Sequence, residues 1–281
     1  INSDVNIESV AKPNFIIFIA DDISWDDIGY LGNKSIKTPN IDNLFSEGLV
    51  FKNMYLTTSS CSPSRNSIIT GRYPHNTGAP ELHTEPPMGM KTFVKALKRN
   101  NYYTVSSGKF HMGDYAIRGF DEIHSDRKIN GHGGEAYWVN AIENAPDDKP
   151  FFMWFASHDA HRGWAENQFT GTHKPNEIEV PEYLVDGPKT RLDLVNYFDE
   201  ISRFDYYIGE VIKKLKEKGN YENTIIIVMA DNGRPFPHSK TRVNDQGVKT
   251  PFVVHYPKLT ASNNSVTESL ISAVDIAPTL I

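Results

Sequence analysis

The sequence predicts an α/β protein whose central sheet is largely parallel. Short apolar runs alternate along the chain with segments of helical periodicity, which is the pattern of strands joined by crossover helices. Three of these runs are apolar over nearly their whole length, as expected of strands buried on both faces of a sheet. They are Asn14–Ala20, Phe151–Ala156 and Thr224–Ala230.

Helix and strand signals account for the segments between these runs. Pro39–Glu47 predicts a helix, because Thr38 precedes it as a cap, its proline suits the first helical position and Gly48 follows its end. Further helices are expected at 62–70, 90–100 and 135–144, and further strands at 49–54, 102–106 and 252–256.

The longest helix is expected at 191–218, because apolar side chains recur there on one stripe at spacings of three and four. The stripe consists of Leu194, Tyr197, Phe198, Ile201, Phe204, Ile208, Val211, Ile212 and Leu215. Residues 163–189 are rich in proline, glycine and charge and predict a long loop, which at that length is usually functional or disordered. Residues 275–281 predict the start of one more helix.

Composition excludes several classes of protein. Hydrophobic residues make up 39% and charged residues 23%, which excludes disordered, collagen-like and coiled-coil chains. The net charge of −6 argues against a nucleic-acid-binding surface, so cations for an anionic ligand must gather in one pocket. A single cysteine, Cys61, excludes an intramolecular disulfide and a cysteine-based zinc site. No apolar run approaches the roughly 20 residues of a membrane span.

Polar side chains follow each of the three buried strands. Asp21 and Asp22 follow the first, residues 157–162 the second, and Asp231 and Asn232 the third. A single Asp at a strand end is usually a turn former, but three such ends on one sheet edge favour a site, because ligands bind beyond the carboxyl ends of parallel strands. The oxygen donors predict Ca²⁺, with Mg²⁺ second, rather than zinc, and a divalent ion would make adjacent carboxylates tolerable.

Cys61 lies at the expected start of a helix among small polar residues, a poor setting for a core cysteine. A helix start favours an anion, and Arg65 lies one turn further along. The run from Cys61 to Arg72, Cys-Ser-Pro-Ser-Arg-Asn-Ser-Ile-Ile-Thr-Gly-Arg, resembles the signature of the sulfatase family, whose cysteine is oxidised to Cα-formylglycine. The other matching elements, in family order, are residues 21–22, 108–111, 158–162 and 231–233.

The resemblance implies roles for individual residues. One hydroxyl of the hydrate made from Cys61 attacks sulfur and the other expels sulfate, which divides one hard displacement into two easier steps. The metal held by the four oxygen donors and by the modified Cys61 polarises the reacting oxygens, and Arg65 holds the hydrate. Lys109 binds sulfate and His111 accepts a proton; we expect both on one face of an extended segment.

His161 is implied as the acid for the leaving group, and zinc binding by His158 and His161 is the competing interpretation. Lys240 is implied as a second sulfate-binding cation, with Lys249 as a rival. Arg162, His83 and His158 are the candidates for substrate contacts, and surface positions are the alternative for Arg162 and His83.

The motifs at 59–65, 158–162 and 231–240 resemble the heparan N-sulfatase branch most. This implies an alkaline-phosphatase-like sandwich, with residues 1–281 as a catalytic domain incomplete at its C-terminal end. It also implies removal of N-sulfate from glucosamine of heparin or heparan sulfate, and maturation by a formylglycine-generating enzyme. The alternatives are an exo-acting O-sulfatase, a phosphate-ester hydrolase of the same superfamily and a non-catalytic sulfoglycan-binding fragment. The chain starts with Ile1, so we expect that an upstream segment was removed, and a single cysteine suits a periplasmic or secreted bacterial protein better than a lysosomal one.

Overall fold

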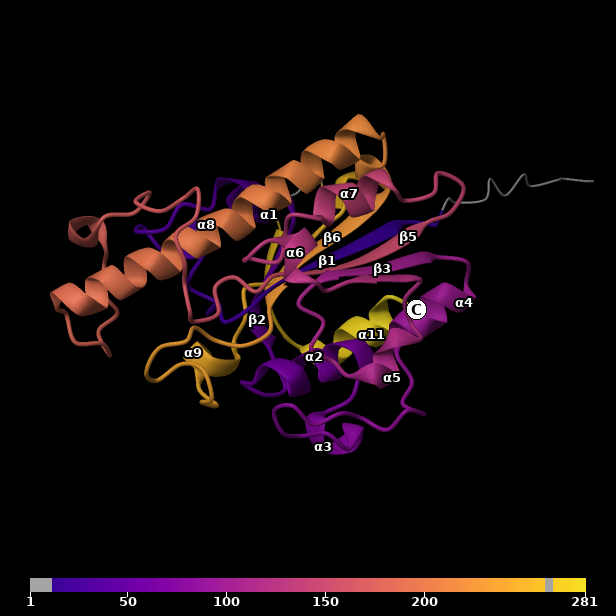
Figure 1. Ribbon diagram of the computed structural model, residues 1–281, viewed down its shortest axis with the longest axis horizontal. Helices are drawn as coiled ribbons and strands as arrows, with labels where there is room; N and C mark the ends of the chain where they lie inside the picture. The colour runs from indigo at the N-terminus through magenta and orange to yellow at the C-terminus, as the bar shows by residue number, and fades with distance from the viewer. Residues whose placement is uncertain (1–11, 261–264) are drawn as a thin grey trace, which may run out of the picture.

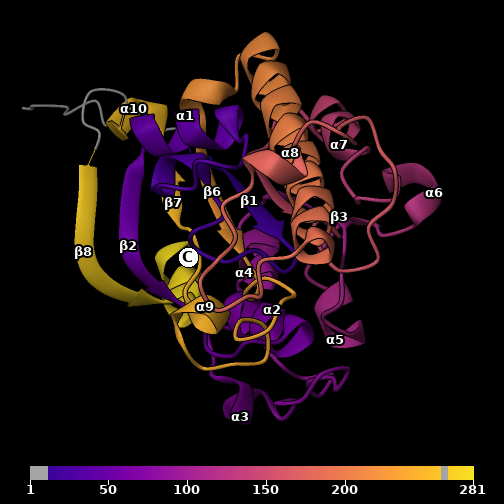
Figure 2. The same cartoon turned by 90° about the vertical axis from the view of Figure 1, so that its left-hand side faces the viewer.

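The computed structural model describes residues 12–260 and 265–281, which form one eight-stranded sheet in the order β4–β3–β5–β1–β6–β7–β2–β8. β7 runs antiparallel to both of its neighbours, β6 and β2, and the other described pairs are parallel. Figure 2 shows β8 beside β2 at one edge of the sheet. The strands are β1 Asn14–Ala20, β2 Leu49–Tyr55, β3 Tyr103–Gly108, β4 Glu122–His124, β5 Phe151–Ala156, β6 Thr224–Ala230, β7 Val253–His255 and β8 Ser265–Ser272.

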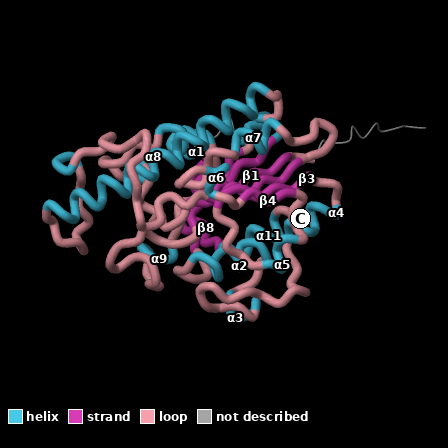
Figure 3. Tube along the Cα trace, viewed as in Figure 1, coloured by secondary structure: helices cyan, strands magenta, loops and turns pink. Residues whose placement is uncertain are grey.

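Helices cover both faces of the sheet. α1, α7 and α8 lie on one face and α2, α4, α5 and α11 on the other (Figures 1 and 3). The α-helices are α1 Pro39–Glu47, α2 Cys61–Thr70, α3 Pro74–Thr77, α4 Phe93–Arg99, α5 Asp114–Ile117, α6 Arg127–Asn130, α7 Trp138–Glu143, α8 Pro188–Glu217, α9 Asp245–Val248, α10 Pro257–Thr260 and α11 Ile276–Thr279. Short 3₁₀ turns occur at Gly29–Leu31, Pro175–Glu177, Tyr221–Asn223 and Ala273–Asp275.

Alternation along β1 divides the core into two layers. Ile16 and Phe18 pack with α1, α7 and α8, whereas Ile17 and Ile19 pack with α2, α4 and α11. Because both faces are covered, every residue of β1 is buried, which explains its continuous apolar sequence. The α/β class and the parallel centre of the sheet are confirmed.

The differences from the expected elements have local causes. α4 and α7 are shorter than expected, and α8 begins three residues earlier because Pro188 takes its first turn. β8 was missed, since this edge strand is mostly exposed and its sequence, SVTESLIS, has no apolar run. The expected loop at 163–189 carries only the turn Pro175–Glu177, and Asp199 of α8 anchors it by accepting hydrogen bonds from the amides of Gly171 and His173.

The central strands β5, β1 and β6 end level with one another, because Ile19 pairs with Ala156 and Ala20 with Ala230. The chain segments that leave them are joined by backbone hydrogen bonds: Asp21 donates to the Asp159 carbonyl at 2.8 Å, and Asp231 donates to the Ala20 carbonyl at 3.1 Å. The polar residues after the three strands therefore share one edge, as expected. No helix among the described residues is long and apolar enough to cross a membrane.

Candidate active site

Four side chains at this edge form a compact ligand set. Asp21, Asp22, Cys61 and Asp231 each offer one atom within 4.8 Å of the others, and all four side chains are buried. The Cys61 Sγ lies at the first residue of α2, 3.6 Å from Asp21 Oδ1 and 4.0 Å from Asp22 Oδ1. Among the described residues this is the only such group of three or more His, Cys, Asp or Glu ligands, and it includes neither His158 nor His161.

Asn232 completes the set with an amide. Its Nδ2 donates to Asp22 Oδ1 at 2.6 Å, whereas its buried Oδ1 has no hydrogen-bond partner. A buried oxygen left without a donor, beside three carboxylates, is an arrangement that a hard divalent cation would satisfy. The residues present therefore fit a Ca²⁺ or Mg²⁺ ion better than zinc.

Each carboxylate of the set has its own cation. Arg65 donates through Nε to Asp231 Oδ2 at 2.8 Å, and Lys240 Nζ donates to both oxygens of Asp22 at 2.6 and 2.7 Å. Lys109 Nζ donates to Asp21. Three cations thus balance three carboxylates, so a divalent ion would leave the site with net positive charge, which suits an anionic ligand.

The protonation equilibria reflect this crowding. Burial opposes ionisation of Asp21, but the field of Lys109 and Arg65 outweighs it and lowers the pKa of Asp21. Burial, with Asp21 acting in the same direction, raises the pKa of Asp22, and the charge of Lys240 opposes this rise. Burial followed by the charge of Asp231 raises the pKa of Cys61 to about 12, so the thiol is neutral at pH 7 and a poor nucleophile in that form.

Three of the candidate histidines lie on segments that contact the ligand set or α2. His111 Nε2 lies 2.9 Å from His83 Nδ1, and the His83 amide donates to Ser62 Oγ at 2.9 Å on α2. Burial and the charge of Lys109 lower the pKa of His111 to about 4. His161 is half-exposed, its Nε2 lies 4.0 Å from Asp22 Oδ2, and burial lowers its pKa.

His158 is anchored through its backbone. Its amide donates to the Gly133 carbonyl at 2.6 Å, and burial, with Arg127 and Lys109, lowers its pKa to about 3. The imidazole is therefore neutral over the physiological range, unlike a cation that would bind an anionic substrate.

The prediction that an extended segment carries Lys109 and His111 on one face is wrong. β3 ends at Gly108, whose φ is +96°, and His111 has a φ of +44°, so the chain turns rather than alternating. A Cβ at Gly108 would lie 2.0 Å from the Ala156 carbonyl oxygen, which explains the glycine. The turn directs Lys109 to Asp21 and His111 to His83.

The structure separates the two candidate lysines and defines the surroundings of Arg162. Lys249 lies over the Trp25 ring at 4.6 Å and is not paired with the ligand set, unlike Lys240. Arg162 binds both carboxylate oxygens of Asp193, at 3.1 and 2.9 Å. Arg162 also lines a cavity of about 500 Å³ that opens onto the ligand set and is shared with Asp22, His161, Pro235, Phe236, Pro237, Lys240 and Thr241.

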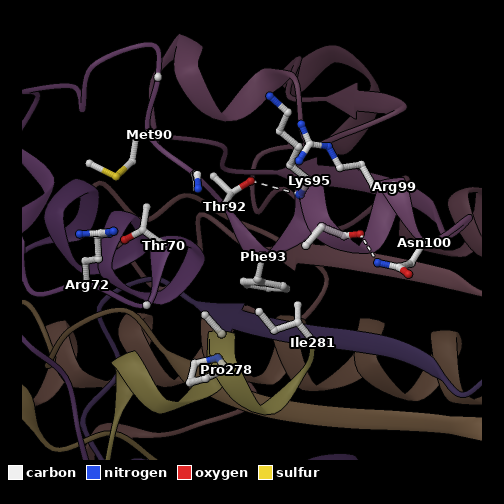
Figure 4. Close-up of a pocket in the computed structure, with 15 residues that line it drawn as sticks. Thr70, Arg72, Met90, Thr92, Phe93, Lys95, Arg99, Asn100, Pro278 and Ile281 are labelled. Carbon is white, nitrogen blue, oxygen red and sulfur yellow. Dashed lines mark hydrogen bonds between the residues drawn. The ribbon is translucent and has the colours of Figure 1, made fainter.

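A larger cavity, of about 840 Å³, lies between the end of α2, α4 and α11 and shares no residue with the ligand set. Figure 4 shows its basic side chains, Arg72, Lys95 and Arg99, around Phe93 and Pro278. Of these two cavities, only the smaller is lined by a carboxylate of the ligand set, Asp22, and by the cation bound to it, Lys240.

Two residues that support the site were not identified from the sequence. Asp193 fixes Arg162, and Arg203 binds Asp159 through Nε at 2.7 Å. Both belong to α8, whose core-facing stripe was assigned to apolar packing alone. The signal available was the occurrence of Asp199, Glu200, Arg203 and Asp205 beside that stripe, since charged groups are buried only when paired.

A mostly parallel sheet between two helical layers, with its polar pocket at the carboxyl ends of the central strands, is the alkaline-phosphatase-like fold. Solved structures that share this fold include a putative sulfatase of Bacteroides fragilis and a phosphonate monoester hydrolase of Agrobacterium radiobacter, with TM-scores of 0.82 and 0.77. The family model described as Sulfatase matches residues 13–281. The chain belongs to the sulfatase family.

The relatives differ in their named substrates. Human N-sulphoglucosamine sulphohydrolase is 28% identical, over 96% of this chain and 61% of the relative. An ulvan-active sulfatase of Formosa agariphila is 27% identical, over 96% and 52%. The crystal structure of Ps i-CgsB in complex with k-i-k-neocarrahexaose has a TM-score of 0.80 and 26% identity, over 96% of this chain and 71% of that one. The chain thus spans between half and two thirds of the length of these curated relatives.

Proposed function

We propose that the protein hydrolyses the sulfate ester or sulfamate of a sulfated saccharide, with Cys61 supplying the nucleophile after oxidation to Cα-formylglycine. The observation that carries the proposal is the position of Cys61: its Sγ lies within 4.0 Å of two carboxylates of a metal-ligand set, at the start of a helix. An unmodified thiol there is neutral, because burial raises the pKa of Cys61 to about 12. Conversion to a hydrated aldehyde would give this position a hydroxyl nucleophile instead.

Asp21, Asp22, Asp231, Asn232 and the modified Cys61 would hold the metal, for which Ca²⁺ is the first choice and Mg²⁺ the second. A bound divalent cation supplies Lewis-acid polarisation of the oxygens that react.

The chain's own cations and histidines perform the remaining tasks. Arg65 is fully buried, keeps Asp231 oriented and donates to the Lys109 carbonyl at 2.9 Å. The ammonium groups of Lys109 and Lys240 are placed to bind sulfate oxygens. The lowered pKa leaves His111 neutral at pH 7, so it can accept the proton of the hydroxyl that expels sulfate, with His83 as its partner. His161, which lines the cavity, would give a proton to the leaving nitrogen or oxygen.

For the substrate we propose N-sulfate on a non-reducing-end glucosamine of heparin or heparan sulfate. The human relative named N-sulphoglucosamine sulphohydrolase supports this choice. An exo-acting O-sulfatase is the second candidate, and the relatives named ulvan-active and the complex with a neocarrahexaose support it. If Cys61 is not modified, the same pocket would bind a sulfoglycan without turnover.

The test uses full-length protein produced with a formylglycine-generating enzyme. We expect the peptide that carries Cys61 to be about 18 Da lighter than encoded. The protein should release glucosamine from N-sulfoglucosamine and leave 6-O-sulfated N-acetylglucosamine intact, and Cys61→Ala should be inactive but folded. The reverse substrate pattern would favour the O-sulfatase, and full activity of Cys61→Ala would overturn the sulfatase mechanism.

We propose further that residues 1–281 are the N-terminal catalytic domain of a periplasmic or secreted bacterial protein. The family match over residues 13–281 supports the first part and the single cysteine the second. Fractionation of the source cells, followed by detection of the protein in the periplasm or medium, tests the location. Recovery in the cytosol alone would contradict it.

A further inference from the structure

The active-site cavity continues into a second hollow. The first, of about 500 Å³, contains Asp22, His161 and Lys240. The second, of about 430 Å³, shares Arg162, Phe236 and Pro237 with it and is otherwise lined by Leu184, Val185, Lys189, Thr190 and Asp193. Each volume lies within the roughly 300–1,000 Å³ typical of small-molecule sites, so the two together offer room for more than a single sugar unit.

The wall shared by the two hollows is held rigidly. Arg162 binds both carboxylate oxygens of Asp193, and its Nη2 donates to the Pro235 carbonyl at 3.1 Å. Its guanidinium lies 4.5 Å from the Trp164 ring centroid and 5.0 Å from that of Phe236. A side chain fixed by an ion pair, a carbonyl and two rings provides a preformed surface, which reduces the ordering cost of binding.

The lining of the second hollow is amphipathic. Val185 is 83% exposed and Leu184 is half-buried, so an apolar patch faces solvent beside polar Thr190 and Asp193. Lys189 is exposed, and among the described residues it has no ion-pair partner, whereas Arg162 is already paired. The carbon face of a sugar ring suits the aliphatic patch, and an anionic substituent suits the free ammonium.

We propose that this second hollow binds the sugar unit adjoining the sulfated one, and that Lys189 selects a unit that carries an anionic group. The proposal rests on the proposed function for the sulfated unit in the first hollow. The protein then acts on the end of a chain of at least two units, the second unit contributing binding energy while the reacting bond lies at the ligand set.

The test compares three substrates of the mature full-length protein: N-sulfoglucosamine, its disaccharide with glucuronic acid and its disaccharide with glucose. Lys189→Ala should lower kcat/KM for the glucuronic acid disaccharide roughly fivefold, through KM, and leave the other two substrates unchanged. Val185→Gly should weaken both disaccharides but not the monosaccharide. Lys91→Ala, which removes an exposed lysine from the unrelated larger cavity, is the matched control and should change none of them. Equal effects of Lys189→Ala on all three substrates, or no effect, would overturn the proposal.

A binding measurement separates this proposal from the proposed function. Calorimetry with the Cys61→Ala protein should show tighter binding of the glucuronic acid disaccharide than of N-sulfoglucosamine, and Lys189→Ala should remove most of that difference. If the wild type fails to turn over any N-sulfated substrate, the proposed substrate is wrong, and this binding difference still decides the role of the second hollow. Equal dissociation constants for the two ligands would refute that role.

Discussion

Arg203 of α8 binds the side chain of Asp159, and the backbone of Asp159 binds that of Asp21. The Arg203 Nε donates to Asp159 Oδ2 at 2.7 Å, and the Asp21 amide donates to the Asp159 carbonyl at 2.8 Å. The next amide, of Ala160, donates back to the Asp21 carbonyl at 2.6 Å. A buried ion pair behind the site thus fixes the backbone of a proposed metal ligand and of the loop that carries His161.

Replacing Arg203 should damage both stability and the site. Arg203→Met leaves the Asp159 carboxylate buried without its cation, and we expect a loss of about 3–5 kcal/mol in the free energy of unfolding. The double variant with Asp159→Asn should recover much of this stability without recovering activity, because the loop is no longer held. Urea unfolding, together with kcat and KM for each variant, tests the role of the ion pair. If Arg203→Met were stable and fully active, the ion pair would not position the loop.

A pH dependence follows from Glu200, the neighbour of Arg203 on α8. Burial, with Asp159 acting in the same direction, raises the pKa of Glu200 to about 8. Between the ordinary pKa of a glutamate and pH 8, Glu200 holds a proton in the folded protein that it has released in the unfolded chain. The free energy of unfolding therefore falls as the pH rises through this window. The slope should be of the order of 1 kcal/mol per pH unit.

Glu200→Gln removes the titrating group and retains an oxygen for the Ala165 amide, which donates to Glu200 Oε1 at 3.3 Å. We expect the variant to be more stable than the wild type at pH 8 and to show a flatter dependence of Tm on pH from 5 to 8. Glu182→Gln, at an exposed carboxylate, should change neither. Parallel curves for the wild type and Glu200→Gln would contradict the assignment.

The metal proposal predicts a stabilising effect of calcium. Ca²⁺ at about 100 times its Kd should raise the free energy of unfolding by about 2.7 kcal/mol, and a chelator should reverse this. Asp231→Ala should abolish the stabilisation, whereas Asp245→Asn, at an exposed carboxylate outside the ligand set, should preserve it. Elemental analysis that found stoichiometric zinc and no alkaline-earth ion would overturn the assignment.

Lys240 and Lys249 form a matched pair for testing the sulfate-binding role. Lys240→Met removes a cation bound to Asp22, and we expect kcat/KM to fall about 100-fold or more, the usual cost of losing a charge-stabilising group in an active site. Lys249→Met removes a cation that lies over Trp25 and should have little effect on kcat/KM. Steady-state kinetics of the two variants on one substrate makes the comparison. Equal losses of kcat/KM in both would mean that the effect reflects reduced stability and not the loss of a sulfate-binding cation.

Gly108 provides a test of the turn that carries Lys109. Gly108→Ala combines a positive φ with a Cβ placed 2.0 Å from the Ala156 carbonyl oxygen, so we expect destabilisation well above 1 kcal/mol together with loss of activity. Gly219→Ala is the control: its φ is +70°, but no atom lies within 4 Å of the added Cβ. Thermal unfolding of the two variants separates the effect of the steric clash from that of the positive φ alone. Equal losses of Tm in both variants would show that the clash does not contribute.

The sequence predicted those features that depend on local pattern. β1, β5 and β6 are buried on both faces and so are continuously apolar, and α2 begins at the cysteine of a contiguous motif. Features that depend on long-range pairing were not predicted. β8 is an edge strand defined by its pairing with β2, and the partners Arg203 and Asp159 lie 44 residues apart. The turn at Gly108 exists because the Ala156 backbone passes close to it, which no residue in 102–111 reveals.

The pairing of cations with carboxylates in the ligand set also links the proposed binding of the metal to that of sulfate. Lys240 spends its charge on the same Asp22 oxygens that a metal ion would coordinate, so metal and ammonium compete for them. In the proposed site, a bound metal would displace the ammonium and leave it available to an incoming sulfate, so metal and sulfate would bind with positive coupling. Because such coupling is reciprocal, the sulfated ligand must raise the affinity for the metal by the factor by which the metal raises the affinity for the ligand. On this proposal, free protein and saccharide-bound protein would need different concentrations of the ion to fill the same site.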